Sequence, residues 1–357
     1  MKFIIGVIRL QALKIIVIGE CWHGSDCTGL ARGFRELGHA VELIGTDQFF
    51  PMSIGGVRDK ILRRLLSPYC KGSFNEYVLG AIDRIRPDVV VVFKGNYVEP
   101  QTLGSALASG AWLCNFYPDV SAYGHPGLDV DIFSKFNHIF TTKTFGVNDF
   151  FDKFGLADVS FLPHGFDPLV HRPIFSEEIE GEELIDVSFI GTWSPHKELL
   201  LGALEASSIK QNICIWGSQW EKSKNNEVRK SAQLYAITGD YYAQAIGKSK
   251  INLGLLSERR SGASTGDQIT SRTFHIPASG GFMLHERTEE VLEYFEEGKE
   301  IACFDGESEL VDKVAYYLNN EEERIAIAEA GYERCINENR LANRAESILE
   351  KYYATRV

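Results

Sequence analysis

A short segment near the middle of the chain has the residue types that bind a phosphate group. In Gly191-Thr-Trp-Ser-Pro-His-Lys197 an apolar run ends at Gly191, and a helix is expected to begin near Pro195, after the N-cap candidate Ser194. The free N–H groups and dipole of such a helix start, together with the ammonium of Lys197, favour an anion. The alternative is an ordinary strand-to-helix loop with a surface lysine.

A second polar segment places a further cation where it can reach the same anion. Asp267-Gln-Ile-Thr-Ser-Arg-Thr-Phe-His275 follows a Gly/Ser/Thr-rich loop and leads into a short helix. The guanidinium of Arg272 can bind a pair of pyrophosphate oxygens, and His275 lies three positions later on the same helix face. The alternative for His275 is a core or capping role. Gly280-Gly281 ends the helix and indicates a close backbone approach or a positive φ.

The first half of the chain offers a different set of polar residues. Glu20-Cys-Trp-His-Gly-Ser-Asp26 follows the first apolar run and lacks GxGxxG, so it is not a dinucleotide fingerprint. Its Gly24-Ser25 pair can still bring backbone amides to a ligand. Asp119 comes just after the apolar run 112–117, at the strand edge where open α/β sheets bind ligands. A solvated turn is the alternative for Asp119.

Short apolar runs predict the buried parallel strands that position these segments. Residues 14–19, a Gly-bearing loop, a helix at 28–37 and a second run at 40–44 form a βαβ unit. Further strands are expected at 88–93, 112–117, 138–142, 186–191, 212–217, 249–254, 281–284 and 301–304, and helices at 196–206, 287–296, 307–319, 321–333 and 340–353. The pattern predicts the α/β class, with two Rossmann-like, doubly wound domains facing each other across a cleft.

The expected domains are residues 1–170, residues 171–335 and a C-terminal helix in 336–357 that packs back toward the first domain. The Glu-rich stretch 175–183 is interpreted as the linker between the two sheets. Residues 1–12 precede the first strand, as an extension or as the result of an upstream start.

Composition excludes several classes of protein. A chain of 357 residues with 44% apolar and 24% charged residues is neither disordered nor fibrous. No run of 18 apolar residues occurs, so no helix is expected to span a membrane, and no signal-peptide core precedes a cleavage site. A cytoplasmic location is therefore expected. The seven cysteines form no CxxC pair and no cluster at metal spacing, which predicts reduced thiols and no metal site.

The net charge of −12 is unevenly distributed. Residues 1–166 hold 16 basic and 16 acidic side chains, whereas the remainder holds 21 basic and 33 acidic ones. An acidic C-terminal half argues against general nucleic-acid binding there. An anionic ligand of this half must depend on a few local cations or on backbone N–H groups.

One basic, amphipathic segment stands out in the neutral half. Arg58-Asp-Lys-Ile-Leu-Arg-Arg-Leu-Leu66 is expected to be a short helix, with Lys71 beyond it. Its basic face could contact anionic lipid, or a phosphorylated or nucleic-acid acceptor, so residues 58–71 are a candidate for peripheral membrane contact. The alternative is a solvated helix that packs its isoleucine and leucines into the domain.

The segments "INLGLL", "SRTFHIPASGGFMLHERTEEV", "VSFIGTWSPHKELLLGAL" and "FLPHGFDPLVHRP" resemble the CgeB-like (spore-maturation protein) glycosyltransferases, relatives of the retaining glycosyltransferase family 4. The resemblance covers about residues 160–357. It implies a GT-B fold, with a nucleotide-sugar donor in the C-terminal domain and the acceptor in the N-terminal one. It also implies transfer with retention at the anomeric carbon, no metal requirement and no cofactor.

Some functional residues of these relatives have counterparts in this sequence, and others are replaced. Relatives have a Gly-Arg-Leu-x-x-x-Lys motif for the diphosphate; Gly191 and Lys197 match it, and Thr192 stands in the arginine position. From its position, Arg272 could supply the missing cation. The two glutamates that relatives place seven residues apart correspond to Asp267 and His275. An imidazole can still bind ribose hydroxyls.

The resemblance and the residue patterns together predict a full set of site residues. Trp216 or Trp220 is expected beside the nucleotide base, because the Trp216-Gly217-Ser218 turn matches the strand-end loop of relatives. The expected catalytic residues are Lys197, Arg272 and Asp119. The expected donor-binding residues are Gly191, Thr192, Ser194, Trp216, Gly217, Asp267, Thr270, Ser271, His275 and Gly280. The expected acceptor or cleft residues are His23, Gly24, Ser25, His125 and His164.

The predicted function is transfer of a sugar from a nucleotide-diphosphate sugar to a glycan, a lipid-linked molecule, a small molecule or a modified nucleic acid. Two alternatives remain open. A sugar-nucleotide epimerase would need acid and base carboxylates in the cleft. A degenerate GT-B protein would bind a sugar nucleotide or glycan without turnover, and the Asp267/His275 departure favours it.

Overall fold

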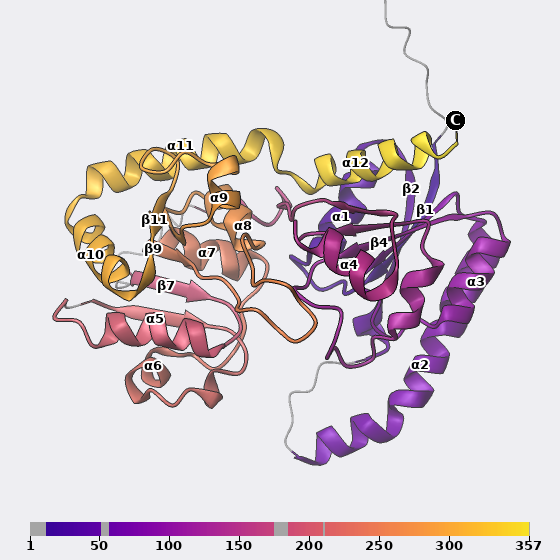
Figure 1. The fold of residues 1–357 in the computed structure, drawn as a ribbon, viewed down its shortest axis with the longest axis horizontal. Coiled ribbons are helices and arrows are strands. Elements are labelled where there is room, and N and C mark those ends of the chain that lie inside the picture. The colour runs from indigo at the N-terminus through magenta and orange to yellow at the C-terminus, as the bar shows by residue number, and fades with distance from the viewer. Residues whose placement is uncertain (1–11, 51–56, 175–184, 210, 357) are drawn as a thin grey trace, which may run out of the picture.

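The computed structural model describes residues 12–50, 57–174, 185–209 and 211–356. In this part of the chain two all-parallel sheets lie side by side along the long axis of the molecule, each covered by helices (Figure 1). The α/β class predicted from the apolar runs is confirmed. The expected linker 175–183 and residues 1–11 of the expected extension lie outside the described residues.

The N-terminal sheet has the strand order β2-β1-β3-β4-β5-β6. Its strands are β1 (Lys14–Gly19), β2 (Ala40–Gly45), β3 (Val89–Phe93), β4 (Trp112–Tyr117), β5 (His138–Thr141) and β6 (Val159–Phe161). Its helices are α1 (Asp26–Glu36), α2 (Val57–Ile85), α3 (Pro100–Ala108) and α4 (Gly146–Phe154), with 3-10 turns η1 (Thr46–Gln48) and η2 (Val130–Lys135). Ile15 and Val17 face one apolar core and Ile16 and Ile18 the other, which explains the unbroken apolar run of β1.

The C-terminal sheet has the order β11-β10-β9-β7-β8. Its strands are β7 (Ile185–Ile190), β8 (Ile213–Trp216), β9 (Ser249–Gly254), β10 (Met283–Glu286) and β11 (Ala302–Phe304). Its helices are α5 (Pro195–Glu205), α6 (Asn226–Ser231), α7 (Asp240–Lys248), α8 (Arg272–Ala278), α9 (Glu289–Tyr294), α10 (Gly306–Asn319) and α11 (Glu321–Glu338), with the 3-10 turn η3 (Trp220–Lys222). Here too apolar side chains fill a core on each face.

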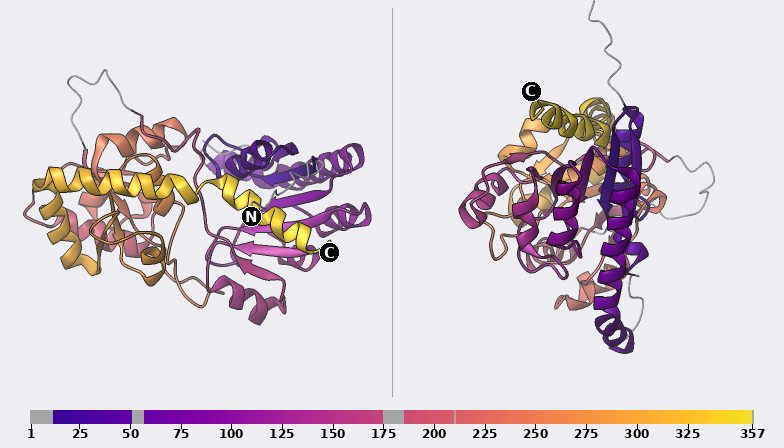
Figure 2. Two further views of the ribbon diagram at one scale, coloured as in Figure 1. Left: turned by 90° about the horizontal axis from the view of Figure 1, so that it is seen from above. Right: turned by 90° about the vertical axis from the view of Figure 1, so that its right-hand side faces the viewer.

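The last helix, α12 (Leu341–Ala354), returns the chain to the N-terminal domain. Figure 2 shows α11 and α12 running in succession over both domains. Ile348 and Tyr352 of α12 join the core that contains Phe34 of α1. A Cβ on Gly33 would lie only 2.7 Å from the Cα of Ala342, so this glycine allows the two helices their close approach.

Several elements differ from the sequence-based expectation, which did not include the helices α3, α4, α6 and α7. β6 was not predicted, because a strand of three residues is too short to show a periodic pattern. The expected short helix at 58–66 is the beginning of α2, which has 29 residues. The alternative that its apolar residues pack into the domain is wrong: Ile61, Leu62, Leu65 and Leu66 are exposed. None of the described helices has the length and apolar character needed to cross a membrane.

Candidate functional site

The carboxyl ends of the strands in both sheets meet at the junction of the two domains, where two cavities adjoin. One, of about 400 Å³, is lined by charged side chains and is called the polar cavity. The other, of about 250 Å³, has walls that include Phe93, Ile190 and Tyr242 and is called the apolar cavity. Both cavities share Ser271 and Arg272. This is the edge at which open α/β sheets bind ligands.

The polar cavity gathers cations from both domains. Its basic residues are Lys94, Lys143, Lys197, Arg260 and Arg272, and its carboxylates are Asp119 and Asp267. Lys94 follows β3 and Lys143 follows β5 in the N-terminal domain, and the other three come from the C-terminal domain. A cavity of this composition suits a multiply charged anion.

Lys197 lies where the sequence predicted it, in the first turn of α5. Ser194 caps this helix by accepting from the N–H of Lys197, and Pro195 is its first residue. The Lys197 ammonium is buried and donates to the Thr192 carbonyl and the Ser257 hydroxyl, both at 3.2 Å. Burial and then the nearby Arg272 guanidinium lower the pKa of Lys197 to about 7. An anion in the polar cavity would therefore favour the charged form of Lys197, which burial and Arg272 oppose.

Arg272 begins α8 and is held over the ring of Phe189, with its guanidinium carbon 5.3 Å from the ring centre. Its Nη2 donates to the Leu255 carbonyl at 2.7 Å, while its buried Nε–H has no partner. A Cβ on Gly191 would lie 3.0 Å from Arg272 Nη1, so this glycine makes room for the guanidinium. Because one donor is unused, Arg272 can bind a ligand oxygen without losing a protein contact.

The two carboxylates of the polar cavity are each paired with a lysine of the N-terminal domain. Asp267 Oδ1 lies 2.6 Å from the ammonium of Lys143, and both side chains are buried. Burial alone would raise the pKa of Asp267, but the charge of Lys143 outweighs it and holds this pKa below its usual range. Asp119 Oδ2 lies 2.7 Å from the Lys94 ammonium and 3.6 Å from Nε2 of His125.

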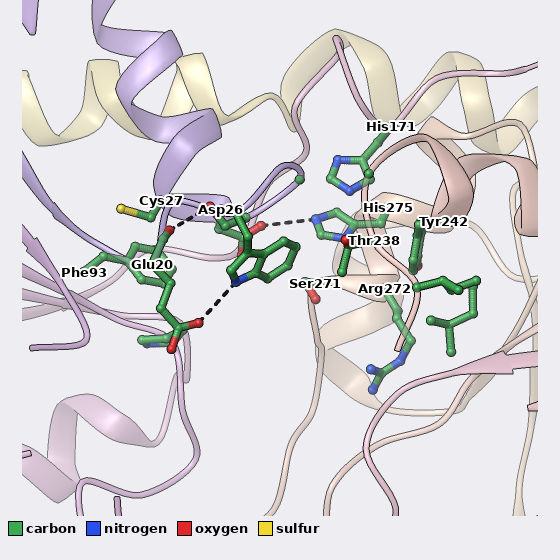
Figure 3. Close-up of a pocket in the computed structure, with 17 residues that line it drawn as sticks. Glu20, Asp26, Cys27, Phe93, His171, Thr238, Tyr242, Ser271, Arg272 and His275 are labelled. Carbon is green, nitrogen blue, oxygen red and sulfur yellow. Dashed lines mark hydrogen bonds and ion pairs between the residues drawn. The ribbon is translucent and has the colours of Figure 1, made fainter. Parts of the chain in front are cut away.

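The apolar cavity contains a buried carboxylate between two imidazoles. Asp26, the first residue of α1, lies 2.9 Å from Nδ1 of His164 and 3.3 Å from Nε2 of His275. Figure 3 shows Asp26 and His275 pointing toward one another across the domain junction, with His171 beside them. The rings of His171 and His275 stack at 3.7 Å. Burial would raise the pKa of Asp26, but the hydrogen bonds with His164 and His275 hold it well below its usual range.

The predicted loop after β1 closes the apolar cavity from the N-terminal side. Gly24 has a φ of +93°, and a Cβ there would lie 3.0 Å from the backbone nitrogen of Gly239. The Ser25 hydroxyl accepts from the N–H of Thr28 and donates to the Glu20 carbonyl, so it caps α1. His23 lies at the exposed rim, 3.9 Å from Asp240.

Besides Gly191, Ser194 and His23, four predicted residues line neither cavity. Trp220 is fully buried and donates its indole N–H to the Gly191 carbonyl, so it supports the loop that follows β7. Trp216 ends β8 inside an apolar core. Gly217 sits where a Cβ would overlap the Gly191 carbonyl at 2.0 Å. Gly280 follows α8 with a φ of +77° and contacts Pro173.

Most other predicted residues line the cavities. The polar cavity includes Thr192, Lys197, Asp119, His125, His164, Asp267, Thr270, Ser271 and Arg272, and the apolar cavity includes Gly24, Ser25, Ser271, Arg272 and His275. Sequence reasoning missed Asp26, Lys94, Lys143 and His171. The two lysines could have been predicted, because each directly follows the carboxyl end of a predicted strand, where open α/β sheets bind ligands. No local pattern identified Asp26 or His171.

The arrangement can bind an anion and stabilise negative charge as it develops on a leaving group. Among the described residues, no three His, Cys, Asp or Glu side chains are grouped so as to hold a metal ion. The expectation of a metal-independent reaction stays a prediction.

Comparison with known proteins places this geometry in context. Residues 196–350 match the family model described as "Glycosyl transferase-like". No curated protein sequence matches the chain. Among solved structures, a glycosyltransferase from Rickettsia africae superimposes with a TM-score of 0.65 at 12% identity, covering 96% of this chain and 98% of that one.

Two further structures have the same two-domain arrangement. Sucrose-phosphate synthase from Thermosynechococcus elongatus aligns with a TM-score of 0.63 at 11% identity, covering 96% of this chain and 100% of that one. The Anabaena protein HepE, in complex with UDP, aligns with a TM-score of 0.61 at 12% identity and the same coverage. The chain therefore has the GT-B fold, as predicted.

Proposed function

We propose that this protein is a glycosyltransferase that moves a sugar from a nucleotide-diphosphate sugar to an acceptor, with retention of anomeric configuration and without a metal. The convergence of five cations on one cavity at the domain junction carries the proposal. The family match over 196–350 and the GT-B fold support it. The sequence motifs favour the CgeB-like group within these enzymes.

In this proposal the diphosphate occupies the polar cavity. Lys197 and Arg272 bind its oxygens. The free N–H groups expected from the sequence at the start of α5 take no part, because His196 N–H donates to Glu258 Oε1 and Lys197 N–H to Ser194 Oγ. The adjoining apolar cavity takes the nucleoside, with His275 near the ribose. The Anabaena neighbour HepE binds UDP and UDP-glucose, so uridine is the first base to test.

Charge development explains how these residues promote the reaction. As the bond between sugar and phosphate breaks, negative charge grows on the leaving diphosphate and positive charge on the anomeric carbon. Lys197 and Arg272 are fixed beside the growing negative charge in a buried site, where such stabilisation is largest. A leaving phosphate oxygen accepts the acceptor's proton on the same face, and Asp119 with His125 orients the acceptor hydroxyl.

The pairing of the carboxylates favours transfer over epimerisation. An epimerase that eliminates and re-adds the nucleotide needs an acid and a base in the cleft. Asp119 and Asp267 are instead paired with Lys94 and Lys143 at 2.7 and 2.6 Å, and the charge of Lys143 holds the pKa of Asp267 below its usual range. Asp267 is therefore not poised to donate a proton.

The test follows release of nucleoside diphosphate from a panel of nucleotide sugars, with binding measured in parallel by calorimetry. We expect one sugar nucleotide to bind and to be hydrolysed or transferred slowly. K197A should weaken binding at least tenfold, because it removes a buried charge-assisted contact. Binding without release would support the degenerate alternative, whereas no binding of any nucleotide sugar would overturn the proposal. NMR of the product's anomeric proton distinguishes retention from inversion.

A further inference from the structure

The N-terminal half of α2 carries a row of apolar side chains that nothing in the described chain covers. Ile61, Leu62, Leu65, Leu66 and Tyr69 form this outer stripe, and Leu65 and Tyr69 are 71% and 76% exposed. Their spacing places them on one face of the helix. Figures 1 and 2 show this half of α2 projecting beyond both domains.

The outer stripe is not an extension of the side of α2 that packs on the protein. The second half of the helix buries a core-facing stripe of Phe74, Val78 and Ile82. Ile61, Leu65 and Tyr69 each precede a member of that stripe by thirteen residues, which is about 3.6 turns, so the two stripes lie on roughly opposite sides. The apolar face of the first half is therefore turned away from the domain core.

Charge indicates what covers the outer stripe. Residues 58–71 contain five basic side chains and one acidic side chain, in a chain of net charge −12. Arg64 lies on this half of the helix and is exposed. A helix with one apolar face and a basic opposite face lies in the interface of an anionic bilayer, with leucines among acyl chains and cations at phosphates. Pairing of two copies would instead bring two basic segments together.

We propose that α2 docks this protein on an anionic phospholipid surface through the outer stripe. The apolar side chains enter the boundary between headgroups and acyl chains, and the exposed guanidinium of Arg64 contacts lipid phosphates. The docking surface lies outside both cavities, so it stands independently of the proposed transfer reaction.

Flotation of the full chain with phosphatidylcholine vesicles, with and without phosphatidylglycerol, tests the proposal. We expect binding only to the anionic vesicles, and weaker binding as salt rises. R64E should weaken it about 30-fold, since two units of charge change near the surface. L62S/L65S should weaken it on the order of 100-fold, because two apolar side chains no longer enter the membrane.

L199S/I325S is the matched control, because Leu199 and Ile325 are similarly exposed but lie in the C-terminal domain. It should bind like the parent chain, and circular dichroism should show that all variants are folded. Absence of binding to anionic vesicles, or binding unchanged in L62S/L65S, would overturn the proposal. A dimer in sedimentation that L62S/L65S dissociates, without vesicle binding, would identify a second copy as the occupant and also overturn it.

Discussion

At the scale of single residues, the site depends on buried charges that compensate one another. Lys143 and Asp267 come from different domains, and their 2.6 Å contact keeps a carboxylate ionised inside the cavity proposed for a diphosphate. Lys197 has no such carboxylate partner among the described residues; its ammonium donates to a carbonyl and a hydroxyl and lies 5.8 Å from the centre of the Phe189 ring. An incoming diphosphate would be the counter-charge that Lys197 lacks.

This situation of Lys197 predicts a pH-dependent affinity for UDP. Its pKa of about 7 means that the ammonium loses its proton as pH rises through 7. A diphosphate binds the ammonium better than the amine, so the dissociation constant should increase above about pH 7, by at most tenfold per pH unit. Calorimetric titrations with UDP from about pH 7 to about pH 9 measure the slope.

The control for this prediction is K197R, which keeps a positive charge throughout that range and should flatten the profile. A parent chain with a flat profile would contradict the assignment of Lys197 to the diphosphate.

At the scale of elements, the strands were predictable and the contacts between domains were not. A strand such as β3, Val89–Phe93, is covered on both faces, so its four valines are all buried. Such a continuous apolar run can be recognised in the sequence as a buried strand. Lys197 was found for a similar reason, since its cap and helix start are local. The contact of Asp26 with His164 joins residues 138 positions apart. The contact of Asp26 with His275 also depends on how the two domains face each other, which no local pattern encodes.

α12 is the element that ties the second domain back to the first. Arg344 at its start donates from Nε to the His164 carbonyl at 3.1 Å, so the helix also supports a residue of the polar cavity. Further along, Ile348 is fully buried among residues of β1 and α1. The N-terminal core is thus completed by the last helix of the chain.

I348A should therefore lower the free energy of unfolding by about 2–5 kcal/mol, through lost burial and the cavity left behind. Urea unfolding followed by circular dichroism measures the change. E350A, at an exposed position on the same helix, should stay within about 0.5 kcal/mol of the parent. Equal stability of I348A and E350A would mean that α12 does not complete the core.

At the scale of the whole molecule, the charge asymmetry has a structural counterpart. The acidic C-terminal half contributes three cations to the polar cavity, and the neutral N-terminal half contributes Lys94 and Lys143 across the junction. The proposed donor site therefore has all of its cations only when the two domains are in contact. The net negative charge of the C-terminal half repels other anions from the surrounding surface.

On acidification, the molecule should unfold at a higher pH than protonation of its carboxylates alone would cause. Several histidines are buried, and burial lowers the pKa of His138 and His285 to about 4 and also lowers that of His171. In the unfolded chain each titrates near 6.5. Between these values the unfolded state binds more protons, so stability falls as pH falls, by up to about 1.4 kcal/mol per pH unit for each histidine. Glu286 raises the pKa of His196, so the contribution of His196 to stability is fully present below about pH 6.5 and stays constant across this window.

Urea midpoints measured from about pH 6.5 down to about pH 5.5 test this expectation before most carboxylates titrate. The midpoint should fall steadily across that window, and H285N should reduce the slope because it removes one fully buried imidazole. H23Q removes a histidine that is 55% exposed and should leave the slope as it is. A constant midpoint across the window would show that the buried imidazoles accept protons without unfolding, which their burial and neutral hydrogen bonds oppose.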